Sequence, residues 1–374
     1  MDERKLLVLV APLDWGLGHA TRCIPIIQAL LAQNCSVILA GEGKVKSLLE
    51  NEFPMIPFLD LPGYRIKYTN DKWLLPISIV AQIPKILNAI RSERDWLEKI
   101  AEEFQIDAVI SDNRFGFYHR KIPSVFITHQ LLIKAPIAIV QDYIQELNYQ
   151  YINQYIECWV PDNKGNNNLA GDLSHPNDMP GVPVHYIGPL SRFNDNTLPA
   201  EEKHLFVLLS GPEPQRTNLE KILKMQIAEY TGDVVFVRGL PGEDDELYIS
   251  PNVSVYNHLP AEELENKMRK ASMIISRCGY STVMDIAALN KKSILIPTPG
   301  QTEQEYLGTY LQQKKLALCV KQGDFNLQKA LTLAEAFRYK DFESISRQAL
   351  STVVSAFINK VRAGEQLTKE EMQG

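Results

Sequence analysis

The sequence has little of what marks several common classes of protein. Its five cysteines form no CxxC pair, which argues against a disulfide framework or a cysteine-based zinc site and favours a reducing cytoplasm. No apolar run reaches the roughly 20 residues of a membrane-spanning helix. The apolar stretch Leu6–Val10 lacks a signal-peptide cleavage site, so we expect a buried strand there. The net charge of −6 argues against broad nucleic-acid binding.

What the sequence does contain is a repeated alternation of short apolar runs and amphipathic stretches. Strands are expected at Leu6–Val10, Ser36–Ala40, Ala108–Ser111 and Ser124–Thr128, and the rhythm restarts at Leu205–Leu209. Strands that alternate with helices are typical of a parallel, doubly wound sheet. The expected fold is therefore α/β, with two Rossmann-like doubly wound parallel-sheet domains facing across a cleft.

The region between the two halves is rich in turn residues. Residues 161–183 hold many asparagines, glycines and prolines and predict a long surface loop. Tyr186–Leu190 is expected to be a last short strand before a hinge, and Asp195–Lys203 a polar linker. The expected parts are an N-terminal domain (1–190), a C-terminal domain (204–340), and a C-terminal helix with a polar tail (341–374).

Four loops at predicted strand ends carry chemistry suited to a ligand. The first is Asp14–Arg22, where Gly16 and Gly18 allow a sharp turn and a close ligand approach. His19 follows at the carboxyl end of the sheet, beside a helix N-terminus that offers unpaired N–H groups. The alternative is a plain tight turn capped by His19.

The second loop, Leu209–Thr217, opens the second domain. Ser210 and Gly211 leave room for a phosphate group, and Arg216 is placed to neutralise it. Pro212 and Pro214 remove two N–H donors from this loop. The alternative is a proline-rich turn without a ligand.

The third loop, Ile275–Asp285, again joins a strand, a glycine turn and a helix N-terminus, which together form a seat for an anion. Asp285 is expected in the first turn, where it would accept hydrogen bonds from a ribose diol or merely complement the helix dipole. The fourth loop, Pro297–Tyr306, offers groups suited to sugar hydroxyls. Its alternative is a solvated helix start.

At these residues the chain resembles the GT-B glycosyltransferases, in particular the MurG-like and UDP-glucuronosyltransferase-like group. Gly16–Arg22 looks like the group's first glycine–histidine motif, and Ile274–Asp285 with Pro297–Tyr306 resembles its donor-binding signature, of the glycosyltransferase family 28 C-terminal type. The likeness covers nearly the whole chain in organisation. It implies an inverting, metal-independent transfer from a nucleotide sugar, most often a UDP-sugar as co-substrate, without a further cofactor. It also implies that the first domain holds the acceptor, that the second holds the donor, and that the last helix crosses back.

The expected donor-binding residues combine these loops with positions that match the family. Asp285 takes the ribose-binding position, backbone groups of Asn257–Leu259 would read the uracil, and Arg192 lies near the nucleotide. Glu303 and Gln304 would contact the donor sugar, with Glu305 as the alternative register. The full set is Gly16, Gly18, Arg192, Ser210, Gly211, Arg216, Asn257, His258, Leu259, Arg277, Gly279, Tyr280, Ser281, Thr282, Asp285, Gly300, Glu303, Gln304 and Glu305.

Transfer of a sugar to a hydroxyl group needs a general base. His19 is the first choice, because a neutral imidazole takes up a proton near pH 7. Asp112, at a strand end, is the second catalytic candidate, which would orient His19 or replace it. Its alternative is a turn or cap aspartate. His129 is expected to be a buried histidine with a structural role.

The segment Trp73–Leu87 is unusually apolar and has basic neighbours. Such a segment suits peripheral contact with an anionic membrane, and with it a lipid-linked acceptor at the inner membrane face. The alternative is a lid or core helix over the acceptor site. The acceptor class otherwise stays open among glycans, lipid-linked sugars and small molecules.

Two other functions compete with transfer. Gly18-His19-x-x-Arg22-Cys23 also resembles the first motif of a UDP-sugar hydrolase of related fold, in which the histidine activates water. The second rival is a non-catalytic nucleotide-sugar-binding protein, which would need neither His19 nor Asp112.

Overall fold

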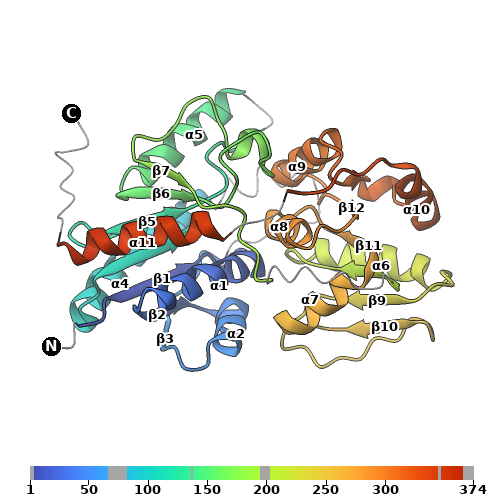
Figure 1. Ribbon diagram of the computed structural model, residues 1–374, viewed down its shortest axis with the longest axis horizontal. Coiled ribbons are helices and arrows are strands. Elements are labelled where there is room, and N and C mark those ends of the chain that lie inside the picture. Colours follow the sequence, from blue (N-terminus) through green and yellow to red (C-terminus); the bar gives the residue numbers. More distant parts are fainter. Residues whose placement is uncertain (1–3, 66–81, 136–137, 194–202, 344–346, 365–374) are drawn as a thin grey trace. The chain divides into compact units, whose positions relative to one another are not determined.

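The computed structural model divides the chain into two compact units. The first unit runs to Leu190 and takes in the C-terminal helix, and the second begins at Ser191. Most of Trp73–Leu87, the linker after residue 193 and the polar tail lie outside the part of the chain that is described. The described residues are 4–65, 82–135, 138–193, 203–343 and 347–364 (Figure 1).

The first unit is built on a seven-stranded parallel sheet of order β3-β2-β1-β4-β5-β6-β7. Its central strands are almost continuously apolar and buried, as expected when helices cover both faces of a sheet. The strands are β1 (Leu7–Pro12), β2 (Ser36–Gly41), β3 (Phe58–Asp60), β4 (Ala108–Asp112), β5 (Ser124–Ile127), β6 (Glu157–Val160) and β7 (Val184–Tyr186).

Helices from both ends of the chain pack on this sheet. Helix α11 (Gln348–Arg362) lies against α1 (Leu17–Ala32) (Figure 1). The Phe357 ring meets Trp159 of β6 edge-on, with ring centroids 5.6 Å apart, and Lys360 lies 3.5 Å from the Glu157 carboxylate. The other elements are α2 (Gly43–Glu52), α4 (Ile83–Phe104), α5 (Ala138–Ile152) and the short 3-10 helix η1 (Gly171–Leu173).

The second unit repeats the plan with a six-stranded parallel sheet of order β10-β9-β8-β11-β12-β13. Its strands are β8 (His204–Leu208), β9 (Val234–Val237), β10 (Val253–Tyr256), β11 (Ala271–Ser276), β12 (Ser293–Leu295) and β13 (Leu318–Cys319). Its helices are α6 (Gln215–Ile227), α7 (Ala261–Arg269), α8 (Tyr280–Ala288), α9 (Thr302–Gln313), η2 (Gln322–Asp324) and α10 (Leu327–Ala336). The expected fold class, two Rossmann-like parallel-sheet α/β domains, is confirmed.

Two local expectations were wrong. The strand expected at Tyr186–Leu190 is β7, which already ends at Tyr186, because Gly188 at φ 74° turns the chain and Pro189 has no N–H group for a strand ladder. Asp285 is not in the first turn of its helix, because α8 starts at Tyr280. Complementing the helix dipole therefore does not explain this aspartate.

The loop after β6 is organised rather than loose. The Asp162 carboxylate is fully buried and accepts hydrogen bonds from the backbone N–H groups of Leu169 and Ala170 and from the Ser174 hydroxyl. One carboxylate thus satisfies several donors of a segment that has little secondary structure of its own.

Candidate active site

Each sheet has one point where the order of the strands reverses. In the first unit β1 and β4 are neighbours, with Pro12 opposite Asp112, yet their next strands lie on opposite sides. In the second unit β8 and β11 stand in the same relation. Loops diverge above such points and leave a crevice that commonly binds ligands in open α/β sheets. The predicted loops Asp14–Arg22 and Ile275–Asp285 follow these strands.

The first-unit group consists of His19, Arg22, Asp112 and His129. His19 and Arg22 are three residues apart on α1 and therefore lie on one helix face. Nδ1 of His19 is 3.2 Å from Oδ1 of Asp112, which ends β4. The Arg22 guanidinium donates from Nε to Oδ2 of Asp112 at 2.7 Å and from Nη2 to Oδ1. The predicted proximity of His19 and Asp112 is present in this unit.

The charges in this group follow from burial and from the arginine. Burial alone would raise the pKa of Asp112, but the charges of Arg22 and His19, with their hydrogen bonds, hold the pKa far below its ordinary value. Burial, and then the charge of Arg22, lowers the pKa of His19 although Asp112 opposes both. Near neutral pH the group therefore contains a neutral imidazole beside an ionised carboxylate.

Exposure separates the two catalytic candidates. The His19 side chain is 14% exposed, whereas that of Asp112 is 0% exposed. An enclosed carboxylate that accepts hydrogen bonds from Arg22 cannot take a proton directly from a bound hydroxyl group. The geometry therefore favours the orienting role of Asp112 over the alternative in which it replaces His19.

Arg22 is the member of this group to which the sequence reading assigned no role. It is 2% exposed, and its Nη1 lies 3.1 Å from Nδ1 of His129. Because arginine has only donors, His129 accepts this bond, which agrees with the structural role expected for it. The signal was present in the sequence as the three-residue spacing from His19.

The loop before His19 is anchored by Asp14. Its carboxylate accepts hydrogen bonds from the backbone N–H groups of Tyr64 at 3.0 Å and Arg65 at 3.2 Å. Gly16 has φ 91°, which glycine adopts at little cost, and it stands just before α1. Gly18 lies within the first turn of that helix. These contacts give a structural role to Asp14, for which the sequence offered none.

At the second switch point, the loop after β11 combines a helix start with a buried cation. Gly279 precedes α8, and Tyr280, Ser281 and Thr282 form its first turn, so their N–H groups lie at the positive end of the helix dipole. Arg277 is 1% exposed and donates to three backbone carbonyls, those of Gln215, Ile296 and Pro297. Burial lowers its pKa to about 10.

Arg277 has no carboxylate partner among the described residues, and its Nε has no acceptor. A buried cation without a counter-charge is costly, and a bound anion would offset that cost. Ser210 and Gly211 lie on the loop after the neighbouring strand β8, where Gly211 has φ 100°.

The contacts of Arg216 oppose the role predicted for it. Its guanidinium donates to Glu213 at 2.5 Å and to Glu220 at 3.1 Å, so its charge is already compensated. Glu220 also accepts from Arg238, whose Nη1 donates to the Asn257 side chain at 2.8 Å. The Asn257 backbone carbonyl accepts from Leu240 at 2.7 Å. These bonds fix the segment that contains His258 and Leu259.

Asp285 and Arg192 do lie together, as predicted for a common site, but their side chains form an ion pair with each other. Asp285 is 3% exposed. Its Oδ1 accepts from the Ser191 hydroxyl at 2.7 Å, and its Oδ2 is 3.2 Å from Nη2 of Arg192. A ribose diol would therefore have to displace one of these partners. Burial, and then the charge of Arg192, lowers the pKa of His258 beside them.

In the fourth loop two side chains close the loop on itself. The Gln304 carbonyl oxygen accepts from the Thr298 N–H, and the Glu305 carboxylate accepts from the Gly300 N–H, each at 2.9 Å. Glu303 is half-buried in the same first turn of α9. The amide nitrogen of Gln304 is not used in the Thr298 bond.

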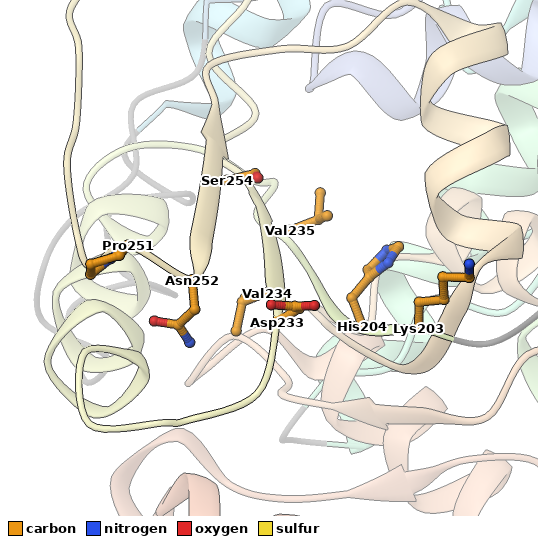
Figure 2. A pocket seen from close by; sticks show the side chains of 8 residues that line it. All are labelled: Lys203, His204, Asp233, Val234, Val235, Pro251, Asn252 and Ser254. Atoms are coloured by element: carbon orange, nitrogen blue, oxygen red, sulfur yellow. The ribbon is translucent and has the colours of Figure 1, made fainter.

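One open cavity lies elsewhere in the second unit (Figure 2). It has a volume of about 350 Å³ and lies where β8, β9 and β10 begin, at the opposite sheet edge from the predicted donor loops. It therefore does not coincide with the predicted site. Its lining residues are Lys203, His204, Asp233, Val234, Val235, Pro251, Asn252 and Ser254.

Two kinds of feature are absent from the described residues. No group of three or more His, Cys, Asp or Glu side chains in this part of the chain is placed to hold a metal ion. No helix among these residues is long and apolar enough to cross a membrane.

Comparison with known proteins points to sugar transfer. Residues 241–358 match the model of the glycosyltransferase family 28 C-terminal domain. The chain is 22% identical over 368 residues to the UDP-N-acetylglucosamine–N-acetylmuramyl-(pentapeptide) pyrophosphoryl-undecaprenol N-acetylglucosamine transferase of Haemophilus ducreyi, and the alignment covers 95% of each chain.

Solved structures give the same fold. The glycotransferase of kitacinnamycin matches with a TM-score of 0.63 at 14% identity, covering 96% of both chains. The spinosyn rhamnosyltransferase SpnG, complexed with thymidine diphosphate, matches with a TM-score of 0.60 at 15% identity, covering 96% of this chain and all (100%) of the other.

Proposed function

Because this chain is a MurG-like glycosyltransferase of the GT-B fold, with a C-terminal domain of glycosyltransferase family 28, we propose that it transfers a sugar from a UDP-sugar to a hydroxyl acceptor. The name of the Haemophilus ducreyi relative supports a UDP-linked donor and a lipid-linked acceptor. The thymidine diphosphate in the rhamnosyltransferase structure supports a nucleoside diphosphate as the leaving group.

The observation that carries the proposal is the neutral His19 beside ionised Asp112 at the first switch point. In the proposed reaction Nε2 of His19 takes the proton of the acceptor hydroxyl. The acceptor oxygen forms a bond to the anomeric carbon while the bond from that carbon to the diphosphate breaks. A single displacement of this kind inverts the anomeric configuration. Asp112 then stabilises the imidazolium.

The departing diphosphate carries away the bonding electron pair and needs positive charge around it. The N–H groups that begin α8 supply part of it, and Arg277, which has no carboxylate partner among the described residues, supplies the rest. We therefore propose that transfer needs neither a metal ion nor a further cofactor. Turnover that is unchanged in excess EDTA is expected, and restoration by added Mg²⁺ or Mn²⁺ after a loss would contradict this part.

The test of the function is a panel of labelled nucleotide sugars, assayed with and without lipid-linked and glycan acceptors. Acceptor-dependent release of UDP supports transfer. Release of free sugar without an acceptor would instead identify the hydrolase, and binding without turnover the non-catalytic binding protein. A labelled glycolipid product also establishes the stereochemistry by NMR of the new bond.

His19→Ala is expected to lower turnover by about a hundredfold or more, because a positioned base contributes at least that much. The UDP dissociation constant should change little, since most of the expected donor-binding residues lie in the second unit, whereas His19 lies in the first. His204→Ala is the matched control, because His204 is a half-buried histidine at the opposite end of the second sheet. Unchanged turnover in His19→Ala would remove this residue from the mechanism.

We further propose a cytoplasmic protein that binds peripherally to anionic membranes, as a lipid-linked acceptor would require. Trp73–Leu87 lies mostly outside the described residues, but Leu87 at its end is 38% exposed on α4. Flotation with vesicles of phosphatidylcholine alone and with added phosphatidylglycerol tests this. If the protein stays in the bottom fraction to the same extent with both vesicle types, the proposal is contradicted.

A further inference from the structure

Nδ1 of His19 has two neighbours that make opposite demands on it. Nη2 of Arg22 lies 2.9 Å away, and Oδ1 of Asp112 lies 3.2 Å away. Arginine has only N–H donors and an ionised carboxylate has only acceptors. If Nδ1 carries no proton it accepts from Arg22, and if it carries one it donates to Asp112. It cannot do both at once.

The two contacts therefore correspond to two tautomers of His19. When Nδ1 accepts from Arg22, the ring proton is on Nε2, and that nitrogen cannot take a proton from an acceptor. When Nδ1 donates to Asp112, Nε2 has a free lone pair and acts as a base. Only the second tautomer supports the proposed reaction, on which this inference rests.

We propose that Arg22 is a positioning residue of the transfer reaction, which competes with Asp112 for Nδ1 of His19 and so sets the share of the base-competent tautomer. The competition is built into the group. Arg22 is itself fixed by two hydrogen bonds to Asp112 and one to His129, so its Nη2 stays at the imidazole. The shorter contact favours the tautomer that Arg22 stabilises in the free protein.

The other charged or titratable groups around His19 do not remove this conflict. Asp112, at the end of β4, contacts the ring, and after β5 His129 is already an acceptor for Arg22. Cys23 of α1 contacts Asp112 at 3.5 Å rather than His19. The positive charge of Arg22 also opposes formation of the imidazolium, in agreement with the lowered pKa of His19.

The first measurement uses the unmodified protein. Two-bond ¹⁵N–¹H correlation spectra distinguish the two tautomers of a neutral histidine, and the spectrum of His19→Gln identifies the His19 signal among the seven histidines. We expect the Nε2–H tautomer to predominate without ligand. A predominant Nδ1–H tautomer would overturn the proposal, whether or not any variant folds.

The second measurement compares Arg22→Met and Arg22→Lys. Arg22→Met removes both the donor and the charge, so the tautomer ratio should invert and the acid limb of the kcat/KM profile for the acceptor should move to higher pH. Arg22→Lys retains the charge without the fork of donors, so its acid limb should stay closer to that of the unmodified protein. An unchanged tautomer ratio and acid limb in Arg22→Met would overturn the proposal.

Arg114→Gln is the matched control. Arg114 is a fully buried arginine of the same unit that pairs with the Glu93 carboxylate at 2.6 Å. Its loss should lower stability without changing the His19 tautomer or the acid limb. The spectra need no turnover, so absence of transferase activity would contradict the proposed function alone, whereas transfer without the tautomer effect would contradict this inference alone.

Discussion

Asp112 in the first unit and Asp285 in the second are both buried carboxylates that contact an arginine at a switch point of their sheet. Their acidities move in opposite directions. Burial raises the pKa of Asp285 in spite of Arg192, whereas Arg22 and His19 overcome burial and lower that of Asp112. The Arg22 guanidinium donates twice to its carboxylate, while the Arg192 guanidinium approaches through Nη2 alone, at 3.2 Å; the Arg192 backbone also hydrogen-bonds to Asp285.

The difference between the two aspartates lies in the charged donors around each carboxylate rather than in the total number of donors. Asp112 is a fixed negative charge, suited to orienting and stabilising an imidazole. Asp285 has a neutral hydroxyl as its second partner, and a ribose hydroxyl has the same chemistry. We expect the Ser191 hydroxyl to be the partner that a nucleotide replaces.

The largest expected difference between the two aspartates is in stability. Asp112→Asn leaves Arg22 buried without its counter-charge, so the free energy of unfolding should fall by about 3–5 kcal/mol. In Asp285→Asn the side chain of Arg192 retains 10% exposure, and a loss of about 1–3 kcal/mol is expected, as for a buried hydrogen bond. Urea denaturation of both variants measures this. A larger loss in Asp285→Asn than in Asp112→Asn would contradict the expected order.

A smaller effect is expected on nucleotide binding. Ser191→Ala frees Oδ1 of Asp285, so UDP no longer has to displace a hydrogen bond worth about 1 kcal/mol, and its dissociation constant should fall severalfold. Asp285→Ala should instead weaken binding. Isothermal titration with UDP measures both, and equal constants in all three proteins would refute the ribose role of Asp285.

The smallest effects are on the pH dependence of stability, and their signs differ. Because the pKa of Asp112 is lowered, its contribution is present above the ordinary aspartate pKa and is lost as the pH falls below it. Because the pKa of Asp285 is raised, its contribution declines as the pH rises from the ordinary value through the raised one. Urea denaturation at several pH values between about 2 and 7 measures this. In Asp112→Asn the free energy of unfolding should fall less steeply toward acid pH, and in Asp285→Asn it should rise more steeply with pH, than in the unmodified protein. Slopes that change in the same direction would contradict the assignment.

The sequence predicts the sheet and the position of the ligand loops because these depend on local patterns. Buried parallel strands are continuous apolar runs, such as Leu205–Leu209, and the glycine loops follow directly after them. The approach of His19 to Asp112 was also predictable, since carboxyl ends of parallel strands share one sheet edge.

The partners of the long polar side chains were not predictable in this way. Arg216 binds Glu220 on its own helix, and Asp14 accepts from a backbone group 50 residues along the chain. Such choices depend on the three-dimensional positions of several donors and acceptors at once. The strand β13 was missed because two residues form no recognisable pattern. Helix α10 was missed although Leu327, Ala330 and Ala334 have helical spacing, because the helix is only 10 residues long.

The return of α11 to the first unit affects how the molecule is made. The second unit is encoded without interruption by a described residue of the first, so it can fold while the chain is still being synthesised. The first unit needs Leu350, Val354 and Phe357, which are buried residues of a helix translated after the second unit. The half of the protein that emerges first from the ribosome is therefore the half that is completed last.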